Sequence, residues 1–293
     1  MKGENVEQIA TPKGTKAVLN KYPIMMKKRY GQNFLIDPHV LSKIIASANI
    51  TEDDCVIEIG PGIGSVTEEL VKKAKKVIAI EIDKDLIPIL NDQFGKYDNF
   101  ILISSDVLKI NMQELIEKEA SGLNVKVVAN LPYYITTPII MMLLENELPL
   151  SSITVMVQKE VADRIVACPA SKEYGAITAS VSYYSAAEIV ANVPQNCFMP
   201  RPNVTSAVIK LTLYKEPPVN VEDKPLFFNI IKASFAQRRK TLLNTLYSNI
   251  TMSITKEELR EILDNSGIGA TARGETLGIN EFAYLTELLK KGM

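Results

Sequence analysis

The sequence contains one histidine and three cysteines among 293 residues, and this scarcity restricts the available chemistry. His39 stands in an Asp-Pro-His pattern that is typical of a helix N-cap and first turn, so we expect it to be structural. Cys55, Cys168 and Cys197 are far apart in the sequence and form no CxxC pair. This spacing indicates free thiols, with neither a disulfide framework nor a metal site.

Long apolar runs and an excess of one charge are also missing. The longest notable apolar stretch, 139–144, is far shorter than the roughly 20 residues that span a bilayer. The N-terminus lacks the apolar core of a signal peptide, so we expect a cytoplasmic protein with no membrane partner. A net charge of −1 excludes a uniformly basic coat for nucleic acid but allows a local basic face.

From residue 38 onward, short apolar segments alternate with helical patterns. The predicted strands are 55–59, 77–82, 100–104, 125–129 and 153–157. The predicted helices between and after them are 38–48, 66–73, 85–94, 112–119, 137–144 and 159–168. Strands that are apolar throughout suit a sheet covered on both faces, so the pattern predicts an α/β fold with a mostly parallel, doubly wound sheet. Two further strands, 188–193 and 207–213, are expected to pair at one edge.

The composition divides the chain into three predicted regions. Residues 1–29 show no periodic pattern and are predicted to form a flexible basic arm, although a merely solvated tail is an equal alternative. Residues 30–215 carry the strand–helix alternation. The Glu-Pro-Pro segment at 216–218 then interrupts it, and 216–293 is predicted to be a small all-helical domain. Its helices are expected near 225–235, 238–248, 256–265 and 279–290.

The first predicted strand runs into Glu58-Ile-Gly60-Pro-Gly62-Ile-Gly64, where a helix follows. Glycines at such a turn let the backbone approach a ligand closely. A dinucleotide fingerprint would need a further glycine at 65 or 67, where Ser65 and Thr67 stand, so pyrophosphate binding is disfavoured.

Two acids follow the next predicted strands. Glu81 at the end of the second can accept hydrogen bonds from both ribose hydroxyls of an adenosyl group. Asp106, after the third, can accept from an adenine amine. Each acid alone is better explained as a solvated strand end or a helix cap. Together with Gly60 they would lie at the carboxyl edge of the sheet, which favours a nucleoside-containing cofactor.

The fourth predicted strand ends in Asn130-Leu131-Pro132-Tyr133, which matches the Asn-x-Pro-Tyr signature of methyltransferases that modify planar amines. An adenine amine is a poor nucleophile because its lone pair is delocalised into the ring. The side-chain oxygen of Asn130 and the carbonyl of Leu131 would accept its N–H groups and aim the nitrogen at a methyl donor. Tyr133 is expected to stack on the target base. Phe198, in the proline-rich segment 198–206, is a second stacking candidate, with a core aromatic as the alternative.

These motifs, with Gly31-Gln-Asn33-Phe-Leu35-Ile-Asp37, resemble those of the ribosomal RNA small-subunit adenine N6,N6-dimethyltransferase family from about Tyr30 to the end. This is the family of the kasugamycin-sensitivity methyltransferase. The resemblance implies a class I methyltransferase, Rossmann-like fold and S-adenosyl-L-methionine as the cofactor. The residues it implies for cofactor binding are Asn33, Leu35, Gly60, Gly62, Glu81, Asp106 and Asn130. It further implies four methyl transfers onto two adjacent adenines near the 3′ end of small-subunit RNA, in an immature subunit. We expect the protein to act as a monomer.

Two alternatives stay open at this point. The erythromycin-resistance methyltransferases share most of these motifs but modify large-subunit RNA. The segments 158–175 and 235–244 favour the small-subunit enzyme. The other alternative is a ribosome-assembly factor that uses the same scaffold without catalysis, and the intact segment 130–133 argues against it.

RNA contact is expected at two basic clusters, for which a solvated face is the alternative. The candidate residues are Lys27, Lys28, Arg29, Arg238, Arg239 and Lys240. If 238–248 is helical, Arg238 and Arg239 would point about 100° apart, so that one tracks phosphate while the other packs. The target adenine is expected to flip out of its stack into the pocket beside Asn130.

Overall fold

The computed structural model describes residues 7–22, 31–251 and 253–290, and the chain divides into two compact units. Unit 1 comprises 1–162 and 188–213, and unit 2 comprises 163–187 and 214–293. The second unit thus takes in residues from before the predicted boundary at 215. A compact unit need not coincide with a functional domain, so the predicted domain limits stay predictions.

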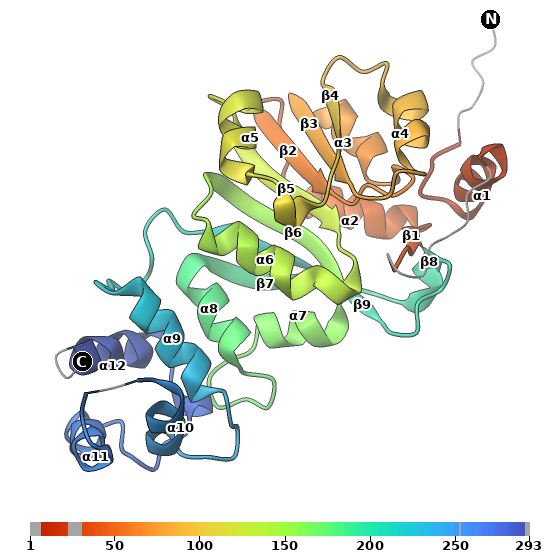
Figure 1. Cartoon of the computed structure of the whole chain (residues 1–293). Coiled ribbons are helices and arrows are strands. Elements are labelled where there is room, and N and C mark those ends of the chain that lie inside the picture. Colours follow the sequence, from red (N-terminus) through yellow and green to blue (C-terminus); the bar gives the residue numbers. More distant parts are fainter. Residues whose placement is uncertain (1–6, 23–30, 252, 291–293) are drawn as a thin grey trace, which may run out of the picture. The chain divides into compact units, whose positions relative to one another are not determined.

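Unit 1 is built on a seven-stranded sheet in the order β4-β3-β2-β5-β6-β9-β7 (Figure 1). The strands are β2 (Asp54–Ile59), β3 (Lys76–Glu81), β4 (Phe100–Ser104), β5 (Asn124–Asn130), β6 (Leu150–Gln158), β7 (Ser185–Val193) and β9 (Ser206–Leu213). The neighbours from β4 to β6 pair in parallel, and β9 pairs antiparallel with β6. The mostly parallel, doubly wound sheet is therefore confirmed, as is the pairing of the last two strands at one edge.

Helices cover both faces of this sheet, with α2 and α6 on opposite sides (Figure 1). The helices before and between the parallel strands are α1 (Pro12–Lys21), α2 (Pro38–Ala48), α3 (Thr67–Lys73), α4 (Ile87–Phe94), α5 (Met112–Glu119) and α6 (Thr136–Glu145), and α7 (Lys159–Ile165) follows β6. Every residue of β2 is buried, which explains why its sequence shows no alternation of apolar and polar residues. His39 lies in the first turn of α2, where its backbone N–H donates to the N-cap Asp37, as predicted.

The turn between β2 and α3 depends on glycine conformations. Gly60, Gly62 and Gly64 all have positive φ angles, of 68°, 62° and 90°. The N–H of Gly64 donates to the carbonyl of Pro61 at 2.9 Å, which closes the turn. A Cβ on Gly64 would overlap the ring of Phe94 in α4, so the loop is held in close contact with that helix.

The prediction of a flexible arm over 1–29 is wrong for its described residues 7–22. They contain α1, whose N-cap Thr11 accepts from Gly14 and whose first turn begins with a proline. Ile9 and Ala10 are buried in the core of unit 1, and the N–H of Ile9 donates to the Glu68 carboxylate at 2.9 Å. This docking, rather than any helical periodicity, fixes the segment.

A short antiparallel pair joins two distant segments of unit 1. Strand β1 (Phe34–Leu35) pairs with β8 (Phe198–Met199), so that Leu35 lies opposite Phe198. Neither two-residue strand was predicted. The pairing places the Gly31–Leu35 segment and the proline-rich segment side by side.

Unit 2 is helical around a core of its own, which includes Tyr183, Phe227 and Phe282. Its helices are α8 (Ala176–Tyr184), α9 (Lys224–Ser234), α10 (Leu242–Asn249), α11 (Lys256–Asn265) and α12 (Ile279–Lys290). Three of the four predicted helices are confirmed, whereas the predicted helix 238–248 begins only at Leu242, and α8 was not predicted. Among the described residues, no helix is long and apolar enough to cross a membrane.

Substituting Gly64 tests the packing of the glycine loop. We expect Gly64→Ala to lower the free energy of unfolding by about 2–4 kcal/mol, because the added methyl crowds Phe94 and strains a positive φ. The control is Gly122→Ala, at φ 77° with no atom within 4 Å of an added Cβ, which should cost about 1 kcal/mol. Urea denaturation measures both. Equal losses in the two variants would contradict the predicted crowding.

Candidate functional site

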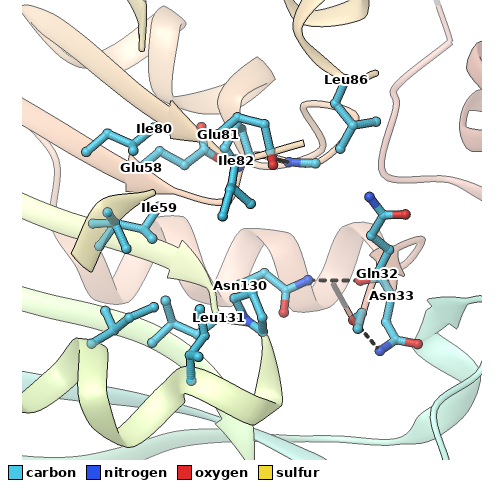
Figure 2. A pocket seen from close by; sticks show the side chains of 18 of the residues that line it. Gln32, Asn33, Glu58, Ile59, Ile80, Glu81, Ile82, Leu86, Asn130 and Leu131 are labelled. Atoms are coloured by element: carbon cyan, nitrogen blue, oxygen red, sulfur yellow. Dashed lines mark hydrogen bonds between the residues drawn. The ribbon is translucent and has the colours of Figure 1, made fainter. Parts of the chain in front are cut away.

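A pocket lies in unit 1 at the carboxyl ends of the parallel strands (Figure 2). It is lined by residues from the stretches 31–35, 58–66, 80–86, 105–107 and 130–139. In an open α/β sheet ligands bind at this edge, because the loops after neighbouring parallel strands converge there.

Most of the predicted site residues meet in this pocket. Its lining includes Asn33, Leu35, Gly60, Gly62, Glu81, Asp106, Asn130, Leu131, Pro132 and Tyr133. Phe198 does not line it. Asn33 and Asn130 are 97 positions apart in the sequence, and the sheet order brings the segments that carry these residues together.

Glu81 ends β3 and is held from two sides. One carboxylate oxygen, Oε1, accepts the N–H of Asp83 at 2.8 Å, and Oε2 accepts the N–H of Gly62 at 3.3 Å. Burial raises the pKa of Glu81 above its ordinary value, although both N–H groups oppose this by favouring the charged form. The carboxylate is therefore fixed in direction beside the glycine loop, as an acceptor of ligand hydroxyls requires.

Glu58 adds a second buried carboxyl to the lining. It lies in β2 and its Oε2 accepts the Thr67 hydroxyl at 2.6 Å. Burial, together with the charge of Glu81, raises the pKa of Glu58 to about 8, so this carboxyl holds a proton at neutral pH. The sequence motif that contains the glycine loop includes Glu58, but no role was predicted for it. An acid inside an otherwise apolar strand was the signal that would have singled it out.

Asp106 combines the two roles that its sequence left open. Its side chain accepts the N–H of Leu108 and caps a short 3-10 helix (Val107–Lys109). It also lines the pocket, and its carboxylate lies 3.8 Å from the Lys109 ammonium.

Asn130 is the last residue of β5, and its side chain reaches the backbone of a distant segment. Its Nδ2 donates to the carbonyl oxygen of Asn33 at 3.0 Å (Figure 2). This bond fixes which way the amide faces, because the Nδ2 end is held by an acceptor. The side-chain oxygen Oδ1 is thereby left to accept from a ligand.

Pro132 and Tyr133 carry the chain from β5 into a 3-10 turn (Tyr133–Ile135) that precedes α6. The Tyr133 hydroxyl shares a hydrogen bond of 2.6 Å with Ser206 Oγ, at the start of β9. Burial raises the pKa of Tyr133 above its ordinary value, so the phenol is neutral. The hydrogen bond fixes the ring at the wall of the pocket.

Phe198 lies elsewhere. Its side chain is 3% exposed and belongs to the hydrophobic core of unit 1. The geometry thus matches the core-aromatic alternative, and a stacking role for Phe198 stays a prediction without support from the pocket.

The predicted RNA-contact residues fall into two groups. Lys27, Lys28 and Arg29 lie outside the described residues. In unit 2, Arg239 and Lys240 are exposed, as predicted for phosphate contact, but they lie in turns before α10 rather than on a helix. Arg238 is engaged within its own unit, since its Nε donates to Glu275 at 3.0 Å and its Nη2 donates to the carbonyl of Lys172. The helical phasing expected for the two arginines is therefore wrong.

The polar groups of the pocket suit a nucleoside that carries a positive charge. The buried carboxyl of Glu81 lines the pocket, where a cation and hydroxyl donors would offset the cost of burying its charged form, and the protonated Glu58 carboxyl adds a neutral polar group to the lining. A Cβ on Gly62 would come within 3.2 Å of the Phe34 ring, so the backbone there is as close to its neighbours as glycine allows. S-Adenosylmethionine has this combination of hydroxyls, an amine and a sulfonium.

The arrangement of strands recurs in solved methyltransferases. The crystal structure of the 23S rRNA methyltransferase ErmE aligns with a TM-score of 0.67 at 24% identity, over 88% of this chain and all of that one, which shows a shared fold. The fold of the protein is thus that of the class I methyltransferases.

A more specific assignment follows from the sequence comparisons. The model of the family described as ribosomal RNA adenine dimethylase matches residues 24–285. The ribosomal RNA small subunit methyltransferase A of Lachnoclostridium phytofermentans is 53% identical over 97% of this chain and 99% of its own. A dimethyladenosine transferase structure from Plasmodium falciparum aligns with a TM-score of 0.74 at 28% identity, covering 88% of this chain and 98% of that one. The chain belongs to the ribosomal RNA adenine dimethylase family, as its motifs indicated.

The buried Glu58 predicts a pH-dependent stability. Its pKa is raised from 4.5 to about 8 on folding, so the stability that the neutral carboxyl provides is fully present below pH 4.5 and is lost as pH rises through about 8. Glu58→Gln keeps a neutral acceptor for Thr67 at all pH values. We expect its melting temperature to rise relative to wild type between pH 5 and pH 9, by an amount that corresponds to at most roughly 4 kcal/mol. A difference that stays constant over this range would show that Glu58 is already charged in the folded protein.

Proposed function

We propose that the protein transfers methyl groups from S-adenosylmethionine to the N6 amines of two adjacent adenines near the 3′ end of small-subunit ribosomal RNA. Family membership and the names of relatives that span nearly the whole chain support this substrate. The single observation that carries the chemistry is the fixed amide of Asn130, whose orientation leaves Oδ1 to accept from an amine in the pocket.

S-Adenosylmethionine supplies a methyl group on a sulfonium, which is already an activated electrophile. The protein therefore has to orient the two reactants and exclude water rather than activate the donor. In the proposed arrangement Glu81 accepts from the ribose hydroxyls and Asp106 accepts from the adenine amine of the donor. The glycine loop at Gly60 and Gly62 lets the backbone approach the ligand, and Asn33 and Leu35 complete the donor-binding wall.

Asn130 and Leu131 bind the amine that is methylated. Two acceptors, Asn130 Oδ1 and the Leu131 carbonyl, hold its N–H groups and direct the nitrogen lone pair at the methyl group. As the N–C bond forms, the bond between the sulfonium and its methyl group would break and release the neutral thioether. Positive charge would develop on the nitrogen, where these oxygen dipoles stabilise it, and the nitrogen would then lose a proton to solvent. Pro132 fixes the backbone direction after Leu131, because its ring restricts φ. No histidine is required for any of these roles.

Tyr133 is the proposed stacking partner of the flipped adenine. The hydrogen bond to Ser206 holds the phenol so that little side-chain entropy is lost when a base stacks on it. Phe198 would serve as the opposite stacking face only if its side chain left the core of unit 1, where it is buried.

The finer details of the substrate are part of the same proposal. We infer that the substrate is an immature small subunit, in which the 3′ end of the RNA is accessible, and that the protein acts on it as a cytoplasmic monomer. Residues 30–215 would hold the methyltransferase site, and 216–293 would contact RNA. Arg239 and Lys240 are the supported contacts of that region, because both are exposed cations.

Substituting Asn130 tests the catalytic proposal. We expect Asn130→Ala to lower kcat by roughly 10²–10³, because it removes one of two acceptors for the reacting amine. The Kd for S-adenosylmethionine should rise less than about tenfold, since the other donor-binding groups are unchanged. Asn124→Ala, at the opposite end of β5, is the matched control and should keep kcat near wild type. Unchanged turnover in Asn130→Ala would refute this role.

The choice of ribosomal subunit is tested directly. Labelled S-adenosylmethionine is incubated with the protein and either immature small subunits, mature small subunits or large subunits. Label is expected on immature small subunits, with mass spectrometry placing two dimethyladenines near the 3′ end of the RNA. Label confined to large subunits would favour the erythromycin-resistance type, and no label on any particle would favour a non-catalytic assembly factor.

A further inference from the structure

Residues Gly31–Asn33, here called the pocket bridge, lie along one wall of the donor pocket. Figure 2 shows Gln32 and Asn33 together on this wall, with Asn130 reaching toward the Asn33 backbone. Within the bridge, Asn33 Nδ2 donates to the Gly31 carbonyl at 2.9 Å, and Gly31 itself has a positive φ of 59°. The bridge is thus a tight turn, and its attachments on either side decide where it sits.

On the β3 side the attachment is Asp83. Gln32 Nε2 donates to Asp83 Oδ2 at 2.7 Å, and Asp83 is 0% exposed. The other oxygen, Oδ1, accepts the N–H of Asp85 at 3.2 Å. Because this carboxylate is buried and charged, the hydrogen bond from Gln32 is stronger than the same contact would be at the surface.

Asp83 is also built into the donor site itself. Its backbone N–H holds the Glu81 carboxylate at 2.8 Å, and its carbonyl accepts the N–H of Leu86 at 3.0 Å. The residue that holds the bridge is therefore two positions from the acid proposed to bind the ribose. A change in Asp83 geometry affects both walls of the pocket.

On the β5 side the bridge ends at Asn130. The Asn33 carbonyl accepts Asn130 Nδ2 at 3.0 Å, and this contact decides whether Oδ1 or Nδ2 of Asn130 is presented to a ligand. An amide turned the other way would offer donors to an amine that needs acceptors. The position of the bridge consequently sets the chemistry of the catalytic amide.

We propose that Gln32 and Asp83 are a positioning pair, which clamps the pocket bridge between β3 and β5 and so holds the Asn130 amide with Oδ1 toward the substrate amine. Neither side chain reacts. The pair acts through the bridge on donor binding and through the Asn33 carbonyl on catalysis. This inference rests on the proposed methyl transfer, and it assigns roles to two residues outside the predicted site.

Exchanging the amide and the carboxylate between positions 32 and 83 tests whether the two residues act as a pair. Gln32→Glu places two carboxylates against each other at hydrogen-bond distance, so it should raise the Kd for S-adenosylmethionine at least about tenfold. At saturating donor its kcat should also fall, by about threefold or more, because the Asn130 amide is less well oriented. In the double variant Gln32→Glu/Asp83→Asn the new amide donates to the new carboxylate. It should recover most of the lost affinity and kcat relative to Gln32→Glu alone.

Gln113→Glu is the matched control. Gln113 Nε2 donates to Glu117 at 2.6 Å on the exposed surface of α5, so this substitution makes the same carboxylate contact away from the pocket. It should leave Kd and kcat unchanged. Calorimetry with S-adenosylmethionine and with S-adenosylhomocysteine gives the affinities, and thermal melting reports folding separately.

The outcomes separate the pair from the overall function. If the effects of Gln32→Glu and Asp83→Asn simply multiply in the double variant, the two side chains do not act as a pair and the inference is wrong. A fall in melting temperature with unchanged Kd and kcat would show a purely structural contact and would equally overturn it. Failure of the wild-type protein to methylate small subunits while it binds the donor would instead contradict the proposed function.

Discussion

The parallel pairing of β2 with β3 and β5 is the constraint on which the site depends. Its register sets Ile59 opposite Ile80, and Glu58 opposite both Ala79 and Val128. Gly60, Glu81 and Asn130 therefore leave the sheet at one edge, although 70 positions separate the first from the last. A slip of one residue would turn every side chain of a strand to the other face and would dismantle the pocket. The buried apolar runs that fix this register are thus as necessary to the site as the polar residues at its edge.

The sheet and most of the pocket follow from local sequence because each depends on a local signal. The strands are apolar runs bounded by polar residues. Because helices cover both faces of the sheet, the side chains on either face of a strand are buried. The glycine loop is predictable from the sequence because three glycines follow a strand end, where the turn needs three positive φ angles. The segment 130–133 is recognisable because it matches the Asn-x-Pro-Tyr signature of methyltransferases that modify planar amines. Because the strands are parallel, the residues that follow them meet at one edge of the sheet, and no further signal is needed to predict this.

The parts that sequence reasoning missed depend on contacts between distant residues. The segment Ala176–Tyr184 is rich in β-branched and aromatic residues, yet it is helical because Tyr183 packs among Phe227 and Phe228. Helix α1 forms where Ile9 and Ala10 dock on the core. The strand pair β1–β8 is too short to leave a pattern. Arg238 could not be placed from composition, since its acidic partner Glu275 lies 37 residues away.

The buried acids around the pocket lower the stability of the fold compared with apolar residues at the same positions. Glu58, Glu81 and Asp83 are each at most 5% exposed, and together they place three carboxyl groups where apolar side chains would stabilise the fold more. Burial raises the pKa values of Glu58 and Glu81 even though the Thr67 hydroxyl and backbone N–H groups donate to them. A cationic, hydroxyl-bearing ligand would remove that cost on binding.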